Sequence, residues 1–293
     1  MERAANIADL SELISQREQA CHSVMTNTET VVRIRKALEA AVAALSPFVS
    51  GNVKAEHKSS GLGPVTEADR LLNYVLHEQL VRDGEGWLSE ESTDDPSRLQ
   101  KSRVWVVDPL DGTREFVEGI PEWSISVAMV EEGRAIAGGI CNPATGEIFL
   151  GSRETGVTYN GKEARASKRK SLAGATVLAS RSEMDRGEWE IFHSAGFVIR
   201  PVGSVAYKLG LVAAGLADAT WTLKPKSEWD VAAGVALVEA AGGFVQFLPG
   251  LPPTFNNRAT RLVGLIACGL LLSEEIKFRV GQFAPVSAGE SRP

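Results

Sequence analysis

Two aspartates, Asp108 and Asp111, follow an apolar run of the sequence, Val104–Val107, and precede Gly112 and Thr113. The run predicts a buried strand, so that the acids lie at its carboxyl end, where open α/β sheets bind their ligands. A helix that starts after Gly112 would offer free N–H groups to an anion beside the acids. Carboxylates next to a phosphate-sized site are typical of Mg²⁺ binding. Taken alone, the same hexapeptide also fits an ordinary loop, because Asp-Pro and Asp-Gly are common turn pairs.

Three other acidic motifs accompany this one. Glu90 and Glu91 stand side by side ahead of a polar loop. Asp69 lies in the first turn of a helix that Thr66 would cap, and Asp230 opens a further helix. Each motif also has a purely structural explanation. Adjacent acids are common on a solvated surface, and an acid in a first turn both caps the helix and interacts favourably with its dipole.

In combination, the four motifs resemble the signature set of the inositol monophosphatase superfamily of Mg²⁺-dependent, lithium-sensitive phosphatases. The matching segments are Val65–Asp69, Ser89–Ser92, Asp108–Thr113 and Trp229–Gly234, and the resemblance covers roughly residues 30 to 285. The tripeptide Arg114-Glu115-Phe116 is similar to the version found in 3′(2′),5′-bisphosphate nucleotidases. Those enzymes remove the 3′-phosphate of 3′-phosphoadenosine 5′-phosphate, whereas inositol phosphatases usually carry an Asn before that Phe.

The resemblance implies a two-metal site. Glu90, Asp108 and the carbonyl oxygen of Leu110 would bind the first Mg²⁺. Asp108, Asp111 and Asp230 would bind the second, and Mn²⁺ would substitute for Mg²⁺. Family members often carry an acid ahead of the Val-Thr pair for a third, loosely held cation, and residues 59–64 offer none. Two ions are therefore expected rather than three, and the expectation that Li⁺ inhibits is weakened.

The resemblance also implies which groups act on the substrate. Thr113 would orient the attacking water, and Asp69 or Glu90 would take up its proton, because a threonine hydroxyl is too weak a base to do so alone. The groups expected to bind the phosphorylated substrate are Gly112, Thr113, Gly203, Ser204, Lys224 and Lys226.

Two of these groups, Lys224 and Lys226, bear on the choice of substrate. They follow Thr222, which stands where inositol phosphatases have an acid that faces ring hydroxyls. Two ammonium groups favour a substrate with a second phosphate, although a solvated basic loop is an alternative. We expect hydrolysis of 3′-phosphoadenosine 5′-phosphate to AMP and phosphate, with inositol-1-phosphate as the alternative substrate. A non-catalytic phosphate- or metal-binding regulator would usually lack a metal-binding or water-orienting residue. Here the expected residues of the two-metal site and the water-orienting pair are all present, namely Asp69, Glu90, Asp108, Asp111, Thr113 and Asp230.

The predicted elements indicate a layered α/β fold. A helix through Val32 and Leu45 and another after Thr66 precede a run of strands, and strands then alternate with helices. The resemblance implies the αβαβα sandwich of the inositol monophosphatase/fructose-1,6-bisphosphatase type. Four divisions are expected: a flexible N-terminal extension at 1–29, an α+β subdomain at 30–170, an αβ subdomain with Asp230 at 171–284, and a disordered tail at 285–293. Within the extension, Met25 is a second candidate for the biological start.

The composition is that of a metabolic enzyme. The 293 residues include 31 basic and 37 acidic side chains, with a net charge of -6, and no basic stripe suggests nucleic-acid binding. No apolar run reaches the roughly 18 residues of a membrane span, and the N-terminus lacks the apolar centre of a secretory signal. Three scattered cysteines predict neither zinc nor a disulfide framework. We expect a cytoplasmic enzyme that acts on a small phosphorylated metabolite, and a homodimer stays open because dimers are common among relatives.

Overall fold

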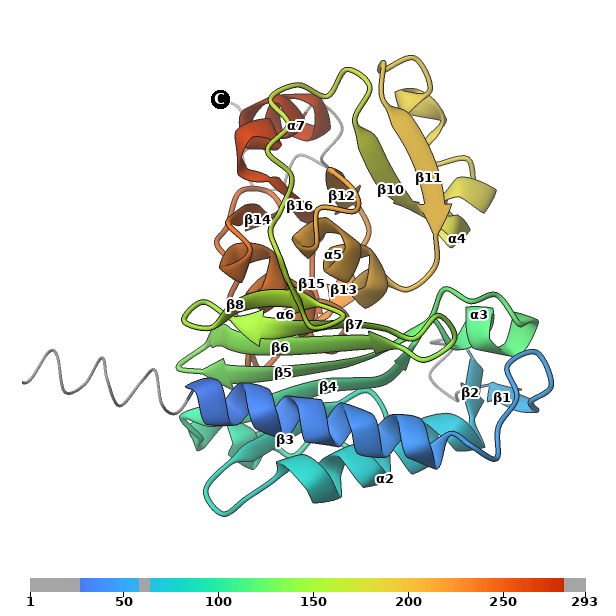
Figure 1. Ribbon diagram of the computed structural model, residues 1–293, viewed down its shortest axis with the longest axis vertical. Coiled ribbons are helices and arrows are strands. Elements are labelled where there is room, and N and C mark those ends of the chain that lie inside the picture. The colour runs from blue at the N-terminus through green and yellow to red at the C-terminus, as the bar shows by residue number, and fades with distance from the viewer. Residues whose placement is uncertain (1–26, 58–63, 282–293) are drawn as a thin grey trace, which may run out of the picture.

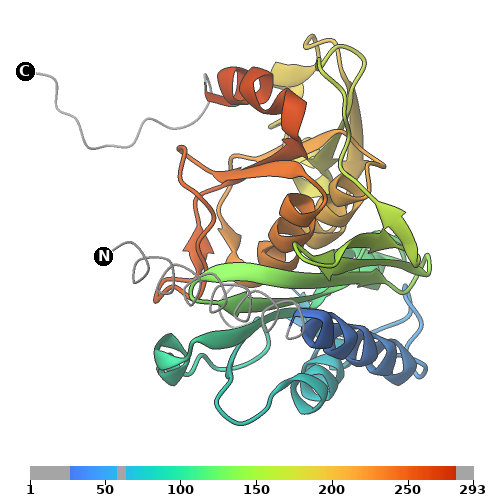
Figure 2. The same cartoon turned by 60° about the vertical axis from the view of Figure 1, so that its left-hand side comes forward.

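Two β-sheets alternate with three helical layers in the computed structural model, which describes residues 27–57 and 64–281 (Figure 1). The order is a helical pair, a seven-stranded sheet, a second helical pair, a five-stranded sheet and an outer helical layer (Figure 2). This is the αβαβα sandwich expected from the sequence. Most of the expected N-terminal extension, residues 58–63 and the C-terminal tail lie outside the described residues.

The seven-stranded sheet holds its strands in sequence order, with β3 parallel to β4 and the other neighbouring pairs antiparallel. Along β4, Trp105 and Val107 pack against the first helical pair, whereas Val104 and Val106 face the second. Because both faces are buried, β4 reads as an uninterrupted apolar run. The strands are β3 Gly86–Ser89, β4 Arg103–Asp111, β5 Ser124–Glu131, β6 Arg134–Asn142, β7 Glu147–Ser152, β8 Gly156–Tyr159 and β9 Lys162–Ala164.

The five-stranded sheet has the order β11-β10-β12-β16-β14. Its first three strands are parallel, and β16 runs antiparallel to both of its neighbours. Its strands are β10 Thr176–Ser180, β11 Val198–Val202, β12 Ala219–Thr222, β14 Gly243–Phe247 and β16 Leu265–Gly269. Two short antiparallel pairs accompany the sheets, β1 Ala55–His57 with β2 Pro64–Thr66 and β13 Lys226–Ser227 with β15 Arg261–Leu262.

The helices fill the remaining layers. The helix at residues 27–44 packs with α2 on one face of the larger sheet, α5 and α6 lie between the sheets, and α7 covers the smaller sheet. The segment before β11 is divided into the short helix α4 and the 3₁₀ helix η2, and Gly187 between them has a φ of +72°. The helices are α2 Glu67–Leu80, α3 Thr113–Glu118, α4 Arg181–Asp185, α5 Val205–Ala213, α6 Glu228–Ala240, α7 Ser273–Gly281, η1 Pro96–Gln100, η2 Glu190–Phe192 and η3 Leu270–Leu272.

Helix α6 lies unusually close to its neighbours. A Cβ atom added at Gly138 of β6 would lie 2.4 Å from the carbonyl oxygen of Ala233 in α6. A Cβ atom added at Gly234 of α6 would lie 2.3 Å from Cβ of Leu209 in α5. Glycine at these two positions therefore sets how closely α6 approaches the larger sheet and α5.

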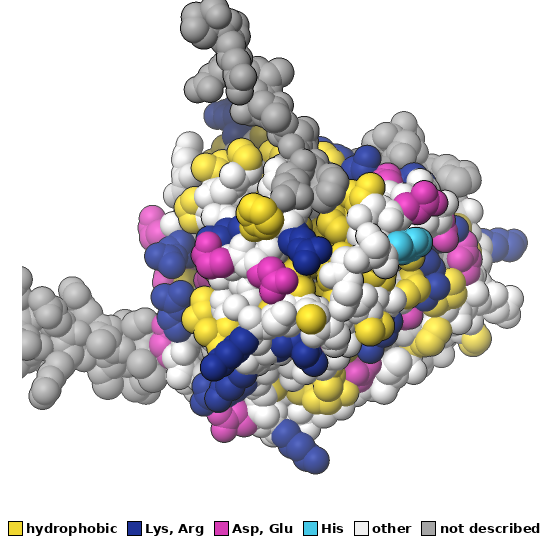
Figure 3. All heavy atoms as spheres, turned by 90° about the horizontal axis from the view of Figure 1, so that it is seen from above, with side chains coloured by type: hydrophobic (Ala, Val, Ile, Leu, Met, Phe, Trp, Pro, Cys, Tyr) yellow, Lys and Arg dark blue, Asp and Glu magenta, His cyan; other side chains and the backbone are white. Residues whose placement is uncertain are grey.

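The face that carries α7 shows no patch of a single charge type. Basic side chains gather toward one edge of this face, and acidic side chains lie among them and among apolar ones (Figure 3). Among the described helices, none is both long and apolar enough to cross a membrane.

Candidate metal centre and active site

A β-bulge in β4 brings Asp108 and Asp111 to the same face of the larger sheet. Asp108 pairs with Ser126 and Asp111 with Ser124, so three steps along β4 match two steps along β5. Side chains alternate between faces along a regular strand, so residues three apart would point in opposite directions. The extra residue cancels this alternation, and both aspartates line one cavity of about 290 Å³.

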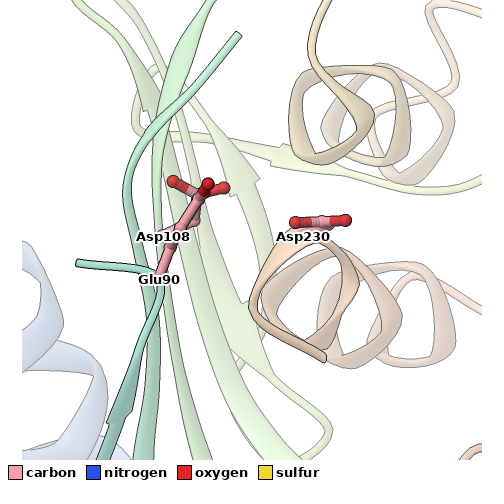
Figure 4. Close-up of side chains that lie close together, drawn as sticks. All are labelled: Glu90, Asp108 and Asp230. Atoms are coloured by element: carbon pink, nitrogen blue, oxygen red, sulfur yellow. The ribbon is translucent and has the colours of Figure 1, made fainter. Parts of the chain in front are cut away.

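Carboxylates from three separate elements converge at this cavity (Figure 4). Glu90 directly follows β3, Asp108 lies in β4, and Asp230 lies in the first turn of α6. Each offers a carboxylate oxygen, and these three oxygens all lie within 4.8 Å of one another. Strands β3 and β4 are parallel neighbours, so their carboxyl ends place Glu90 beside Asp108, while α6 brings Asp230 from the facing layer. A set of oxygen ligands is the kind that Mg²⁺ and Mn²⁺ prefer.

The electrostatics of the three-carboxylate cluster favour a bound cation. Burial, followed by repulsion from the other carboxylates of the site, raises the pKa of Asp108 well above its usual value. Burial is also the main cause that raises the pKa of Asp230 to about 7, and repulsion from Asp111 and Glu90 adds to it. A divalent cation among these oxygens would stabilise their charged forms. The residues present therefore fit a divalent metal ion.

The carboxylate of Asp230 also caps the helix that carries it. One of its oxygens, Oδ2, accepts a hydrogen bond from the N–H of Ser227 at 2.8 Å. The capping contact engages that single oxygen, and the side chain still belongs to the three-carboxylate cluster. The two explanations of Asp230, a first-turn acid and a metal-facing carboxylate, are therefore compatible.

A hydroxyl and a further carboxylate lie beside the cluster. The Oγ1 atom of Thr113 is 3.1 Å from Oδ1 of Asp69 and 3.1 Å from the carbonyl oxygen of Leu110, so its single proton has two acceptors. The other oxygen of Asp69 accepts from the N–H and the hydroxyl of Thr66 at 2.8 and 2.6 Å. Burial is the main cause that raises the pKa of Asp69. The cap of α2 and the contact with Thr113 thus use different oxygens of one carboxylate.

Asp111 is held by the turn that leads into α5. Its Oδ2 atom accepts hydrogen bonds from the hydroxyl of Ser204 at 2.6 Å and the N–H of Ala206 at 2.7 Å. The turn is stabilised from below by Lys208, whose buried Nζ donates to the carbonyl oxygens of Val202 and Ser204. Burial is the main cause that lowers the pKa of Lys208 to about 8. These contacts fix Asp111 at the edge of the cluster.

The expected phosphate-binding residues differ in where they lie. Gly112 and Thr113 line the cavity at the start of α3, as a phosphate-binding role requires. Gly203 and Ser204 do not line it. The N–H of Gly203 donates a hydrogen bond to Glu122 at 2.8 Å, and the hydroxyl of Ser204 donates one to Asp111. In this structure, Gly203 and Ser204 therefore contact other protein side chains and do not face the cavity.

The two candidate lysines face different cavities. Lys226 lines the cavity of the carboxylate cluster, and its Nζ lies 3.6 Å from Oε1 of Glu183. Lys224 lines a separate cavity, where its Nζ lies 3.3 Å from Oε1 of Glu188. The expectation of two ammonium groups beside the metal ligands therefore has structural support for Lys226 alone.

Two arginines at this cavity were not among the expected site residues. Arg114, at the start of α3, and Arg261, in β15, both line it. Arg114 stands next to the Asp-Gly-Thr motif, so its place in the sequence was a usable signal. Arg261 reaches the site because β15 pairs with β13, and the local sequence contains no pattern that predicts this pairing.

Comparison with known proteins assigns the chain to a family. The model of the "Inositol monophosphatase family" matches residues 25–267. The chain belongs to this family. The inositol-1-monophosphatase of Rhizobium meliloti is 35% identical over 189 residues, which are 61% of this chain and 70% of that protein.

Solved structures of the inositol monophosphatase family share the fold. The Thermotoga maritima IMPase has a TM-score of 0.72 at 27% identity, and the match covers 87% of this chain and 96% of that one. CysQ from Bacteroides thetaiotaomicron, described as a bacterial member of the family, has a TM-score of 0.69 at 23% identity over 83% of this chain and 97% of that one. Members of the inositol monophosphatase family are phosphatases, so the carboxylate cluster and the Thr113–Asp69 pair belong to a phosphatase.

Proposed function

We propose that this phosphatase is a Mg²⁺-dependent phosphomonoesterase that removes the 3′-phosphate from 3′-phosphoadenosine 5′-phosphate. The observation that carries the proposal is the convergence of Glu90, Asp108 and Asp230 within 4.8 Å beside a hydroxyl–carboxylate pair. The proposed ligands are Glu90, Asp108 and the Leu110 carbonyl for one ion, and Asp108, Asp111 and Asp230 for the other. Bound there, Mg²⁺ would lower the pKa of a water molecule and neutralise the phosphoryl oxygens.

The proposed role of Thr113 follows from its hydrogen bonds. Because its proton is directed to Asp69 or to the Leu110 carbonyl, its oxygen lone pairs are free to accept a hydrogen bond from water. This contact would orient the water toward phosphorus. Asp69, whose pKa is raised mainly by burial, or Glu90 would take up the proton. The N–H groups of Gly112 and Thr113 would stabilise the charge that develops on the phosphoryl oxygens.

The basic side chains at the cavity support a substrate with a second phosphate. Arg114, Lys226 and Arg261 come from three different elements and line the same cavity as the carboxylate cluster. Guanidinium groups present a planar fork that fits phosphate oxygens, and an ammonium adds a compact charge. Arg114 pairs with Glu118 at 3.0 Å and Lys226 with Glu183 at 3.6 Å. A 5′-phosphate on the substrate would share these cations with the carboxylates, whereas a neutral polyol would bring them no charge.

Inositol-1-phosphate is a second candidate substrate. The relative from Rhizobium meliloti is named an inositol-1-monophosphatase. In addition, Thr222, which stands in place of an acid, donates a hydrogen bond to Oε1 of Glu183 at 2.5 Å. The carboxylate of Glu183 therefore lies next to Thr222. The absence of an acid at position 222 does not by itself argue against a substrate with ring hydroxyls.

The test is phosphate release measured side by side on 3′-phosphoadenosine 5′-phosphate, inositol-1-phosphate and fructose-1,6-bisphosphate, with Mg²⁺, with EDTA and with added Li⁺. We expect the highest kcat/KM on the nucleotide and no release in EDTA. Thr113→Ala should lower kcat by about 100-fold or more, while Thr113→Ser, which keeps the hydroxyl, should retain most of it. A higher kcat/KM on inositol-1-phosphate would refute the nucleotide assignment, and undiminished release in EDTA would refute metal dependence.

A further inference from the structure

A buried carboxylate holds the segment that precedes β15. Glu228, the first residue of α6, is fully buried, and its two carboxylate oxygens accept hydrogen bonds from the N–H groups of Asn256 and Asn257 at 2.7 and 2.9 Å. The side chain of Asn257 donates a third hydrogen bond to Glu228 at 2.7 Å. The N–H of Glu228 in turn donates to the carbonyl oxygen of Thr260 at 2.9 Å. The segment from Asn256 to Thr260 therefore has a fixed position relative to the start of α6.

Arg98 holds the same segment from the side of the larger sheet. Its guanidinium is buried and donates to the side-chain oxygen of Asn256 at 2.7 Å and to the carbonyl oxygen of Asn257 at 3.0 Å. The carboxylate of Asp94 accepts two further hydrogen bonds from Arg98, at 2.6 and 3.0 Å. Since Arg98 lies in η1, between β3 and β4 in the chain, the segment is joined both to the larger sheet and to α6.

This doubly held segment places Arg261 at the metal-ligand cavity. Arg261 directly follows the segment, and in the pairing of β13 with β15 it lies opposite Ser227. Ser227 donates its N–H to the carboxylate of Asp230, and both Ser227 and Arg261 line the cavity of the carboxylate cluster. The position of Arg261 at the site is therefore determined by buried contacts on both sides of the segment that leads to it.

Arg261 differs from the other basic side chains of this cavity in its partners. Arg114 pairs with Glu118 at 3.0 Å, and Lys226 lies 3.6 Å from the carboxylate of Glu183. Within the described part of the chain, the guanidinium of Arg261 has neither a carboxylate partner nor a hydrogen bond. Arg261 can therefore bind an anionic group of a ligand without first giving up an ion pair inside the protein.

We propose that Arg261 is the specificity-determining residue that binds the second phosphate of the substrate. The proposal rests on the proposed nucleotide phosphatase function and assigns the 5′-phosphate to one side chain. A second phosphate near the carboxylate cluster is repelled by the negative charges there. A guanidinium offsets this repulsion, because its planar fork donates two N–H groups to phosphate oxygens. Asn257 has a positioning role, since its contacts with Glu228 and Arg98 hold the segment that leads to Arg261.

Two nucleotides that differ only in the 5′-phosphate test the assignment of Arg261. Arg261→Met removes the charge and the N–H donors. We expect KM for 3′-phosphoadenosine 5′-phosphate to rise by about ten-fold and KM for 3′-AMP to stay at the value of the parent. Arg258→Met makes the same change at an exposed arginine of the held segment that does not line the cavity, so neither KM should change. An equal rise for both nucleotides in Arg261→Met, or no rise for either, overturns the proposal.

A double-mutant cycle tests the positioning role of Asn257. Asn257→Ala removes the side-chain donor to Glu228. We expect it to raise KM for 3′-phosphoadenosine 5′-phosphate by about three-fold in the parent and to have no further effect in Arg261→Met, because it acts through Arg261. The same rise in both backgrounds would show that Asn257 acts independently of Arg261 and would overturn its positioning role.

The same two nucleotides separate a failure of this proposal from a failure of the proposed function. If the parent hydrolyses 3′-phosphoadenosine 5′-phosphate and Arg261→Met leaves KM unchanged, the assignment of Arg261 is overturned and the function stands. If the parent hydrolyses inositol-1-phosphate alone, the proposed substrate fails, and both nucleotides are then measured as competitive inhibitors of that reaction. In that case, Arg261→Met should raise the inhibition constant of 3′-phosphoadenosine 5′-phosphate and leave that of 3′-AMP unchanged. Any other result, including no inhibition by either nucleotide, overturns the proposal.

Discussion

At the scale of residues, the aspartates of the site divide their two carboxylate oxygens between the fold and the cavity. Asp69 caps α2 with one oxygen and contacts Thr113 with the other. Asp230 caps α6 and Asp111 is held by the α5 turn, in each case through Oδ2. Each side chain is therefore oriented by the backbone around it before any metal or substrate binds, and replacement by asparagine keeps the shape while it removes the charge.

The raised pKa of Asp230 predicts how pH affects the metal-free protein. With a folded value of about 7 and an unfolded value of about 3.9, the folded state binds more protons between these limits. The stability that Asp230 contributes is therefore fully present below the pKa of the unfolded state, and it is lost as the pH rises through the pKa of the folded state. In EDTA between about pH 5 and pH 8, we expect the parent to lose stability relative to Asp230→Asn, by up to about 1.4 kcal/mol per pH unit.

Urea unfolding at each pH measures this difference. With added Mg²⁺, the parent should instead be more stable than Asp230→Asn, because the ion binds a carboxylate that the variant lacks. Asp83→Asn, a change at an exposed aspartate, is the matched control and should follow the parent. Parallel pH profiles for the parent and Asp230→Asn in EDTA would show that Asp230 ionises freely in the folded protein.

At the scale of elements, α3 starts where the chain leaves β4 in a conformation that favours glycine. Gly112 has a φ of +94°, and a Cβ atom there would lie 3.1 Å from Cβ of Trp123 and 3.2 Å from the carbonyl oxygen of Glu122. A side chain at Gly112 would thus meet both backbone strain and a close neighbour. The geometry of Asp111 on one side and Thr113 on the other depends on this residue.

Gly112→Ala should therefore lower both stability and activity. We expect a loss of about 1–3 kcal/mol in the free energy of unfolding and a fall in kcat, because Thr113 shifts relative to Asp69. Gly146→Ala is the matched control, since its φ is +71° and a Cβ atom there meets nothing within 4 Å. It should cost about 1 kcal/mol and leave kcat unchanged. Full activity in Gly112→Ala would show that the backbone at this position tolerates a side chain.

Local sequence patterns predicted the elements better than the contacts between them. The apolar run at β4 and the helical spacing after Thr66 are visible in the sequence because burial dictates them locally. The position of Arg261 was not visible, since it depends on a two-residue pairing of β13 with β15. Lys224 and Lys226 looked equivalent, but they lie in and after a turn, where alternation does not decide which way a side chain points. The division at residue 170 into two subdomains stays a prediction.

At the scale of the whole molecule, the site depends on how α6 is seated on the larger sheet. Glu90 and Asp108 come from that sheet, whereas Asp230 comes from α6 on the facing layer. The distance between the two layers is set where Gly138 lies against the carbonyl of Ala233. Any change in that distance moves one carboxylate relative to the other two.

Gly138→Ala should weaken metal binding without touching a ligand. The added methyl group would lie 2.4 Å from the carbonyl oxygen of Ala233, so α6 must move outward and carry Asp230 with it. We expect a rise in the Mg²⁺ concentration that gives half-maximal activity, by about ten-fold. The next residue provides the control, because a Cβ atom at Gly139 meets Ile34 and Leu38 on the opposite face of the sheet.

Gly139→Ala should destabilise the fold by about 1–3 kcal/mol but leave the Mg²⁺ dependence near that of the parent. Metal titration of activity and thermal unfolding of the two variants distinguish the effects. Equal Mg²⁺ dependence in Gly138→Ala and Gly139→Ala would mean that α6 does not transmit the strain to Asp230.

The single unmatched residue in β4 also has a consequence for how this gene can change. An exchange of Leu110 for another residue leaves the pairing of the strand intact. The loss of one codon between the two aspartates would remove the unmatched residue, and both aspartates would still point to one face, because residues two apart in a regular strand do so. A descendant that has lost one codon here would therefore keep its sheet and every acidic residue, but it would present the two aspartates to an ion at a shorter spacing, and α3 would begin one residue sooner after Asp108.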